Sequence, residues 1–383
     1  MVNKFEMLRE SLNEKNASSG YDVNLKNFIK ENNLEIIDES NKSNEEYPFV
    51  KEPENLEGAK KIETPNFINN FFESKGYNIV KPKSIINNKG TTLFISSGVQ
   101  ILDKVIFHEQ DIAKEKIFIA QPVLRTQFID QIKEGVSTSF INISSEIINP
   151  PLHDHFNSIK DWLELLKNLG LKKENFAFQA KKGEPLWGNK KFKNNIMVIY
   201  YKGLEIGDAV YNYDIPQNNR ENLIISDIGF GLERIKWILQ GGSYYDNKNI
   251  NLKISDYCKT LTLLAGSGLR PSNKEHGYRF RQFSKKLILE NIHDHENLNQ
   301  IINSFYNFWS QWANLSISKE NITKIINTEN ERNFNRIFLD ILKEKHNDVD
   351  LNINQPTQQL IKALRGTSVD EKFLKEVLNK IYE

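Results

Sequence analysis

The chain contains one cysteine, Cys258, among its 383 residues, and it has no apolar run of membrane-spanning length. A single cysteine excludes a disulfide within the chain and any multi-cysteine metal cluster. Without about 20 consecutive apolar residues no transmembrane helix is expected, and the N-terminus lacks the apolar core of a signal peptide. We therefore expect a cytoplasmic protein that acts without a membrane and without zinc.

An excess of charge is also lacking, because 51 Lys and Arg residues balance 50 Asp and Glu residues to a net charge of +1. Charge summed over the whole chain thus gives no sign of nucleic-acid binding, and any basic surface must be local. A hydrophobic content of 39% and a charged content of 26% are typical of a soluble globular protein. The length allows two or three domains.

The stretch that organises the chain runs from residue 223 to residue 242. Residues 223–225 are apolar and predict a buried strand. Apolar residues at helical spacing over 232–239 predict a helix, which should stop at Gly241-Gly242. The sequence therefore predicts a strand, a tight glycine turn and a helix.

Four residues of this stretch suit a ligand with a phosphate at one end and an amine at the other. Gly229 and Gly231 carry no Cβ and let a ligand approach the backbone. Arg234 lies in the first turn of the predicted helix, where the N-terminus favours negative charge and a guanidinium can hold phosphate oxygens. Asp227, at the predicted strand end, can hold an ammonium group. Strand-glycine-helix turns are common, so an ordinary packing turn remains the other interpretation.

The pattern D-x-G-x-G-L-E-R over residues 227–234, followed by an apolar helix, resembles motif 3 of class II aminoacyl-tRNA synthetases, in the form used by alanyl-tRNA synthetases. The resemblance implies an α+β fold, with an antiparallel sheet flanked by helices and an all-α domain after it. It also implies ATP and Mg²⁺ as cofactors. We expect a polar N-terminal extension over 1–60, a catalytic domain over 61–245 and a helical tRNA-recognition domain over 246–383.

A second motif follows from the strand predicted over 117–125, the polar loop over 126–138 and a returning strand. This hairpin resembles motif 2 of the same family, in which the arginine at the loop entry bridges the amino-acid carboxylate and the α-phosphate of ATP. Arg125 has that position, and a cation placed there lowers the barrier to attack on phosphorus. A surface arginine at a strand end is the alternative. Asn142 stands where the family carries a glutamate, and we assign it to ATP binding.

The amino-acid pocket is expected from two further resemblances. Trp187, in the turn GEPLWGNKK, matches a tryptophan that walls the small pocket of the alanyl enzymes. Glu205-Ile206-Gly207-Asp208 stands where the family has E-I-W-N, whose asparagine holds the substrate carboxylate. An ionised Asp208 would repel that carboxylate. The expected substrate is therefore alanine or a small analogue, or an amino acid bound in a different pose.

A local basic segment lies in the C-terminal half. The pattern predicts a helix to about residue 265, a glycine stop and a second helix from about residue 276. That second helix carries Arg279 and Arg281, which a solvated helix face would also explain. The segment resembles the tRNA-recognition core of alanyl-tRNA synthetases, and Asn273 matches the asparagine that reads the wobble pair of the acceptor stem. An amide can donate and accept at a base edge, so these three residues are predicted to bind tRNA.

Two segments are assigned no chemistry. His153-Asp154-His155 could be a metal cluster, but we predict that Asp154 caps a helix between two histidines. Residues 67–100 resemble motif 1 of the family, with a helix, a proline-containing turn and a short strand. A short amphipathic helix is expected around residues 25–29.

The sequence therefore predicts an enzyme, an AMP-forming ligase that activates an amino acid with ATP and transfers it to tRNA. The chain ends before the point where the family has its editing domain, so no editing is expected. The alternative is an adenylating ligase that passes an amino acid to a carrier protein, a peptide or a metabolite. A third possibility is a non-enzymatic relative that binds tRNA or a partner.

Overall fold

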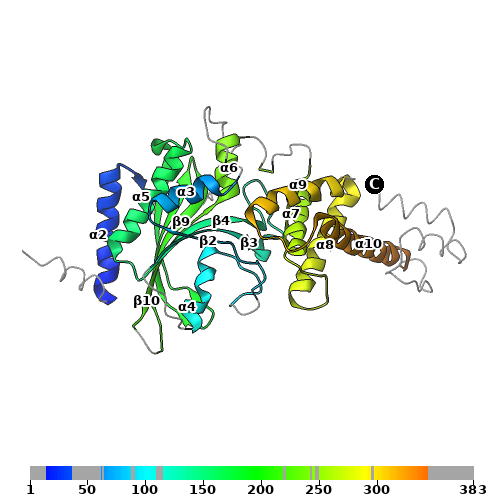
Figure 1. The fold of residues 1–383 in the computed structure, drawn as a ribbon, viewed down its shortest axis with the longest axis horizontal. Helices are drawn as coiled ribbons and strands as arrows, with labels where there is room; N and C mark the ends of the chain where they lie inside the picture. The colour runs from blue at the N-terminus through cyan, green and yellow to red at the C-terminus, as the bar shows by residue number, and fades with distance from the viewer. Residues whose placement is uncertain are drawn as a thin grey trace, which may run out of the picture. The chain divides into compact units, whose positions relative to one another are not determined.

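The computed structural model describes residues 14–36, 62, 64–87, 91–108, 115–218, 221–241, 244–245, 250–294 and 297–343. The chain is α+β, with a mostly antiparallel sheet flanked by helices, as the sequence predicts (Figure 1). It forms two compact units. The first comprises Met1–Lys83, Asn87–Val123 and Phe140–Asp246, and the second Ser84–Ile86, Leu124–Ser139 and Asn247–Glu383.

The sheet has the strand order β1-β5-β8-β9-β10-β4-β3-β2. Its middle, from β5 through β8, β9 and β10 to β4, is antiparallel, whereas β1 pairs parallel to β5 and β2 pairs parallel to β3. A separate two-stranded ribbon joins β6 and β7. The strands are β1 (Glu35–Ile36), β2 (Asn78–Val80), β3 (Lys116–Leu124), β4 (Ser139–Ile148), β5 (Phe176–Gly183), β6 (Leu186–Trp187), β7 (Lys190–Lys191), β8 (Lys193–Tyr201), β9 (Leu204–Ile215) and β10 (Leu223–Gly231).

One face of the sheet is covered by α2 (Glu14–Asn32), α3 (Asn66–Ser74) and α5 (Leu152–Asn168). Aromatic side chains fill this layer because alternate strand residues point to the same face. The ring centroid of Trp162 on α5 lies 4.5 Å from that of Phe230 on β10 and 4.6 Å from that of Phe72 on α3. Phe72 in turn stacks on Phe118 of β3 at 4.2 Å. These rings pack between the helices and this face of the sheet.

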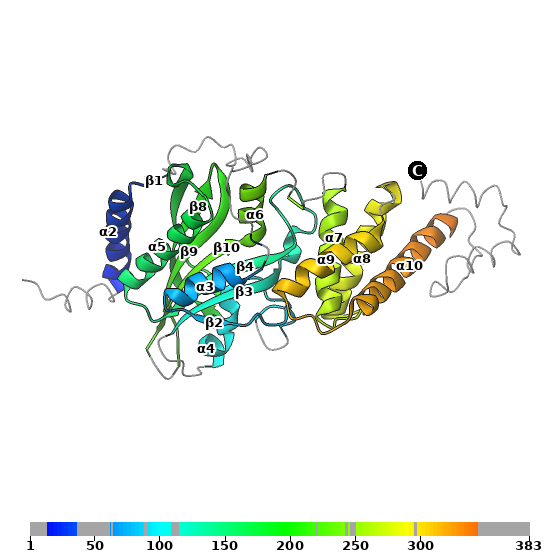
Figure 2. The same cartoon turned by 45° about the horizontal axis from the view of Figure 1, so that its top comes forward.

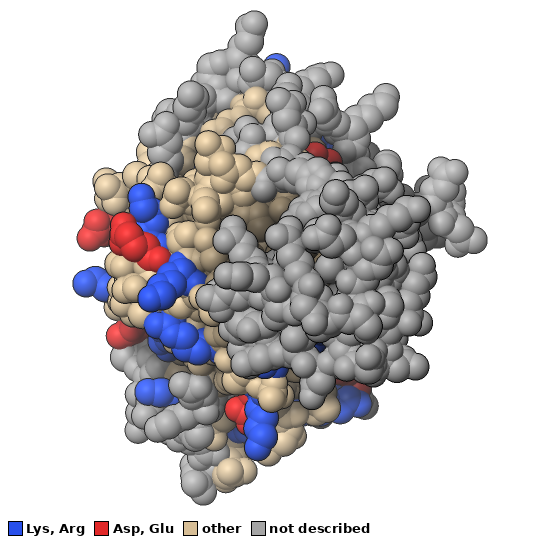
Figure 3. All heavy atoms as spheres, turned by 90° about the vertical axis from the view of Figure 1, so that its right-hand side faces the viewer, with Lys and Arg blue, Asp and Glu red and all other residues tan. Residues whose placement is uncertain are grey.

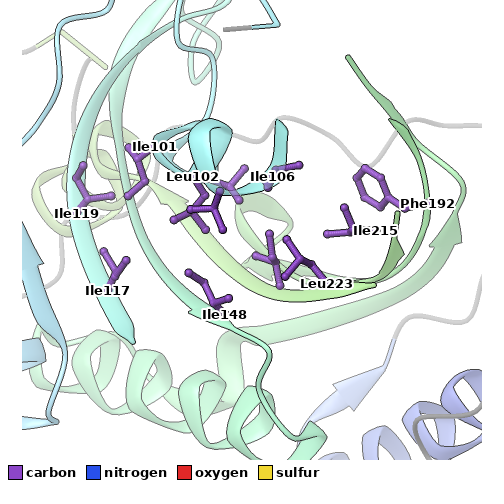
Figure 4. Close-up of a cluster of buried hydrophobic side chains, with 12 residues drawn as sticks. Ile101, Leu102, Ile106, Ile117, Ile119, Ile148, Phe192, Ile215 and Leu223 are labelled. Carbon is purple, nitrogen blue, oxygen red and sulfur yellow. The ribbon is translucent and has the colours of Figure 1, made fainter. Parts of the chain in front are cut away.

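The opposite face meets a short helical segment, formed by the 3-10 helix η2 (Gly98–Leu102) and α4 (Asp103–His108). Figure 4 shows Leu102 and Ile106 of this segment over Ile148 and Leu223 of the sheet. All four side chains are buried in one apolar cluster. In Figure 1, α4 lies on the other side of the strands from α3 and α5. The cluster covers only part of this face, and the polar residues of the candidate site lie beyond it.

The second unit contains the helices α7 (Leu252–Gly266), α8 (Glu275–Asp294), α9 (Leu298–Trp312) and α10 (Lys319–Lys343), which Figure 2 shows together. Almost every residue of α7 is buried, so α7 is the centre of this group. Residues 344–383 lie outside the described residues, and the predicted domain limits stay predictions.

Three local expectations are wrong, and the helix expected around residues 25–29 is found but is longer than predicted. There is no glycine turn before α6 (Leu232–Gln240), because β10 runs through Gly231 and the helix follows at once. The short strand expected near the end of motif 1 is replaced by η2. Asp154 lies in the first turn of α5, and Pro151 takes the cap position. The N-terminal helix is α2, far longer than the segment around 25–29, and its Tyr21 packs 5.4 Å from Phe156 of α5.

Candidate functional site

The residues predicted to bind phosphate lie at the junction of β10 and α6. At Gly231 the backbone is extended, with φ −81°, so no positive φ requires a glycine there. A Cβ added at Gly231 would meet only the Arg234 side chain, at 3.8 Å and beyond. The protein therefore leaves the space over this residue uncrowded. Glu233 fixes the helix start, because its buried carboxylate accepts hydrogen bonds from the backbone N of Ile141 at 3.0 and 3.3 Å.

Arg234 is held against the neighbouring strand. Its Nη1 donates to the carbonyl oxygen of Glu205 at 2.7 Å and lies 3.7 Å from Oε1 of the same residue. The side chain is 21% exposed. A guanidinium fixed in this way, one turn into a helix, keeps a solvent-facing edge for an anion at the helix N-terminus. The sequence prediction of a cation at this place is compatible with the geometry.

The predicted amine-binding residues share one face of the sheet. Directly opposed residues of antiparallel strands point the same way. Asp208 on β9 opposes Gly229 on β10, and Gly229 opposes Ser144 on β4. Two positions earlier on β10, Asp227 opposes Glu146 of β4. Asp208, Gly229 and Ser144 form one cross-strand row, and Asp227 and Glu146 form the next. The two rows are about 7 Å apart along the strands.

Glu146 is the most buried member of this group, with 0% of its surface exposed. Burial raises the pKa of Glu146 well above its usual value, and the carboxylates of Asp227 and Asp208 raise it further. Neither carboxyl oxygen has a well-aligned hydrogen-bond partner among the described residues, and the same is true of the hydroxyl of Ser144. The structure thus places a third acid, with a raised pKa, opposite Asp227 on the sheet face that sequence reasoning assigned only to Asp227 and Asp208.

Asn142, predicted to bind ATP, is engaged inside the protein. Its Oδ1 accepts from the backbone N of Gly98 at 2.6 Å, and its Nδ2 donates to the carbonyl oxygen of Phe230 at 3.2 Å. Gly98 sits so close that an added Cβ would overlap the Oγ of Ser144. Asn142 therefore joins η2 to the sheet beside the β10–α6 junction. Its role toward ATP stays a prediction.

Trp187, the predicted wall of the amino-acid pocket, lies on β6. Its Nε1 donates to Oγ1 of Thr91 at 3.1 Å, and its ring centroid lies 5.9 Å from that of Phe107 and 6.4 Å from that of Phe192. It packs against the apolar cluster that includes Ile148. Ile148 is two positions from Glu146 on β4, so this tryptophan and the acids border the same cluster.

Arg125 follows directly after β3, as predicted. It belongs to the second unit, where its backbone N donates to the carbonyl oxygen of Thr138 at 2.7 Å and closes the base of the loop. The side chain is half-buried. Arg125 therefore stands at the entry of a loop whose two ends are tied together.

The predicted tRNA-binding residues Asn273, Arg279 and Arg281 also lie in the second unit. Arg281 donates from Nε to the buried carboxylate of Glu329 at 3.0 Å, and its Nη1 donates to Oδ1 of Asn273. Arg279 donates to Gln282 at 2.8 Å. Asn273 itself is exposed. Figure 3 shows several exposed Lys and Arg side chains along one edge of the described surface, with acidic residues beside them.

Sequence reasoning missed Glu146, Ser144 and the backbone partner of Arg234. A usable signal exists for Glu146 alone, because it is an isolated acid inside the otherwise apolar and small-residue strand β4. Among the described residues, no group of three or more His, Cys, Asp or Glu is placed to hold a metal ion. No helix in the described part of the chain is long and apolar enough to cross a membrane.

Comparison with known proteins gives a distant relationship. Two alanine--tRNA ligases of Saccharolobus islandicus, from strains M.14.25 / Kamchatka #1 and M.16.4 / Kamchatka #3, are each 22% identical to this chain over 396 aligned positions. The alignment covers 81% of this chain and 43% of each ligase, so the chain spans less than half the length of the relatives it matches. No protein-family model matches the sequence. The similarity suggests a relation to class II aminoacyl-tRNA synthetases, with which the mostly antiparallel sheet is compatible.

Proposed function

We propose that this protein is an AMP-forming ligase that activates a small amino acid with ATP and transfers it to tRNA. The single observation that carries the proposal is the continuous segment from Asp227 to Arg234. It presents a carboxylate on the sheet face, then two glycines, then a guanidinium anchored to Glu205 at a helix N-terminus. The distant similarity to alanine--tRNA ligases supports the same reaction class.

In this proposal each end of the segment has one task. Asp227 binds the amino group of the substrate, and Arg234 binds nucleotide phosphate across the uncrowded space at Gly231. The resemblance to motif 2 gives Arg125 the task of bridging the amino-acid carboxylate and the α-phosphate. Held in line, the carboxylate attacks the α-phosphorus, and pyrophosphate leaves. The enzyme forms no covalent bond to the substrate, so its contribution is positioning and charge.

Mg²⁺ fits this site as a companion of the nucleotide. The ion keeps several waters and binds through phosphates plus one or two carboxylates, so it does not require a dedicated group of protein acids. When bound, it would neutralise charge on the phosphates. Asp208 is the acid of this chain that would hold the ion, since Asp227 binds the amino group.

The test is amino-acid-dependent exchange between ATP and pyrophosphate. We expect Arg234→Ala to lower kcat/KM for exchange by about 100-fold, because a preplaced cation is lost where charge accumulates. Lys236→Ala, two residues further along α6, is the matched control and is expected to retain activity. Normal exchange by Arg234→Ala would contradict the proposed function.

Asp208 favours a second proposal, in which the activated amino acid passes to an acceptor other than tRNA. The residue stands on the substrate face where the resembling family uses an amide, so the amino acid or its pose differs from alanine on the alanyl enzymes. An enzyme with an altered pocket can pass its product to a carrier protein, a peptide or a metabolite. Incubation with labelled amino acid, ATP and total tRNA separates the two. Acylation that RNase removes supports tRNA, and exchange without any RNase-sensitive product supports the other acceptors.

A further inference from the structure

Glu146 has no role in the function proposed above, although its environment is unusual for a purely structural residue. It lies in the middle of β4, fully buried, directly opposite Asp227. A buried carboxyl group ordinarily has hydrogen-bond partners, because desolvation without them costs about 1–3 kcal/mol. Neither oxygen of Glu146 has a well-aligned partner among the described residues, although Ser144 and Asp227 lie close enough to act on its pKa.

A second buried group points into the same space. The hydroxyl of Ser144, on the same face one row along β4, is also fully buried and also lacks a well-aligned partner among the described residues. The backbone of Gly98 covers it from above. Two adjacent buried polar side chains without well-aligned hydrogen bonds, on a face that carries two more carboxylates, form a polar surface that suits a donor-rich ligand.

The negative charge of the acids around Glu146 determines which kind of ligand can bind there. The two titratable side chains of the described residues that raise the pKa of Glu146, Asp227 and Asp208, are both acids. A carboxylate ligand would therefore be repelled, whereas an ammonium group brings three donors and a positive charge. Among the strand residues paired with these acids, the cross-strand neighbour Val210 is apolar and offers no competing donor.

We propose that Glu146 binds the substrate amino group together with Asp227, so that the ammonium lies between two carboxyl groups. The inference rests on the proposed function and deepens it, because it identifies the group that selects an amine over a hydroxyl. A ligand ammonium would replace the proton that the two acids otherwise require between them. Asp208, in the next row, disfavours a carboxylate in that place.

The experiment compares an amino acid with its 2-hydroxy analogue in pyrophosphate exchange. The standard amino acid with the fastest exchange is chosen first, and KM is measured for it, for the 2-hydroxy acid and for ATP. In Glu146→Gln we expect KM for the amino acid to rise about tenfold or more, since one charged hydrogen bond is lost. KM for ATP should stay within about twofold, and the preference for amine over hydroxyl should fall by the same factor as the amino-acid KM rises. Glu164→Gln, an exposed acid on α5 that pairs with Lys75, is the matched control.

A purely structural role for Glu146 predicts a different result. It would raise all three KM values together or lower kcat without changing the preference, and this outcome overturns the inference. If Glu146→Gln does not fold, Glu146→Asp keeps the acid but withdraws it by one methylene, and an unchanged amino-acid KM in that variant overturns the inference equally.

The two proposals fail separately. If wild-type protein exchanges with none of the standard amino acids, the proposed function fails. Glu146 is then judged by the melting temperature with each amino acid added alone. A stabilisation of wild type that is lost in Glu146→Gln supports the amine site, and equal responses in the two proteins overturn it.

Discussion

The carboxylate of Asp256 accepts a hydrogen bond from the backbone N of Thr138 at 3.0 Å, across 118 residues of chain. Its second oxygen accepts from the hydroxyl of the same threonine, and that hydroxyl lies 2.7 Å from Oγ1 of Thr260. Asp256 is fully buried in α7. The loop that begins at Arg125 is thus fastened to the central helix of the second unit at its returning end.

Asp256→Ala should loosen this loop and destabilise the second unit. The backbone N of Thr138 would lose its acceptor inside the protein, at a cost of about 1–3 kcal/mol, whereas the hydroxyl of Thr138 keeps Oγ1 of Thr260 as a partner. Chemical denaturation measures the loss, and Asp340→Ala, an exposed acid on α10, serves as the control. A variant as stable as wild type would show that the loop is fastened by other contacts.

His155 should make the stability of the first unit depend on pH. Burial lowers the pKa of His155 to about 3, and its Nδ1 lies 2.7 Å from Oγ of Ser226. The unfolded chain takes up a proton below about pH 6.5 and the folded chain does not. The contribution of neutral His155 to the free energy of unfolding is therefore complete above pH 6.5. It is lost as pH falls toward 3, by up to about 1.4 kcal/mol per pH unit.

The measurement is the unfolding free energy at pH 7 and pH 5, for wild type and for His155→Phe. The raised pKa of Glu146 acts with the opposite sign, because its contribution is lost as pH rises above the unfolded value. Only the difference between wild type and His155→Phe isolates the contribution of His155 to the pH dependence. Parallel pH profiles in wild type and variant would contradict a neutral buried His155.

Two glycines of the sheet should lose very different amounts of stability when they are replaced by alanine. At Gly207 an added Cβ would overlap the carbonyl oxygen of Gly229 and lie 2.6 Å from Cδ1 of Phe230, so Gly207→Ala should cost about 3 kcal/mol or more. Gly231→Ala has room in the protein and should lose less than about 1 kcal/mol. In the proposed function it should instead raise KM for ATP, since its methyl group lies on the path of the nucleotide. Thermal melts and exchange kinetics give the two readouts, and a Gly231→Ala enzyme with an unchanged KM for ATP would contradict that path.

Asn273 is predicted to act on tRNA and on nothing else. Arg281 holds the Oδ1 of Asn273, and the buried Glu329 holds Arg281. With the oxygen engaged, the amide presents its N–H groups as donors. Asn273→Ala should lower tRNA acylation by about tenfold, from the loss of a base contact of 1–3 kcal/mol, and leave exchange unchanged. The exposed Asn327→Ala on α10 is the control, and equal acylation by all three proteins would remove Asn273 from the interface.

The sequence predicts the α+β fold well where local patterns are strong. The strand before Arg125, the strand that begins at Leu223 and the helix after Gly231 are found nearly where periodicity places them. The glycine turn fails because a G-x-G segment is also compatible with an extended strand, and neighbouring strands decide between the two.

The candidate site could be predicted only in part, for a related reason. Asp227 and Asp208 stand in recognisable motifs, whereas Glu146 is identified only by the register of β4 against β10. Strand register depends on partners far away in sequence, and a shift of one residue would turn Glu146 to the opposite face. Arg234 donates to the backbone carbonyl of Glu205, and no side-chain pattern can reveal a backbone acceptor.

The N-terminal helix has a practical consequence for anyone who shortens this protein. Tyr21 and Phe28 of α2 cover the ring of Phe156, and β1 pairs with the outer edge of β5. A truncated version that starts near residue 62 would uncover an aromatic surface and an open strand edge at once, which is the combination that promotes aggregation. Expression trials should therefore retain residues 14–36.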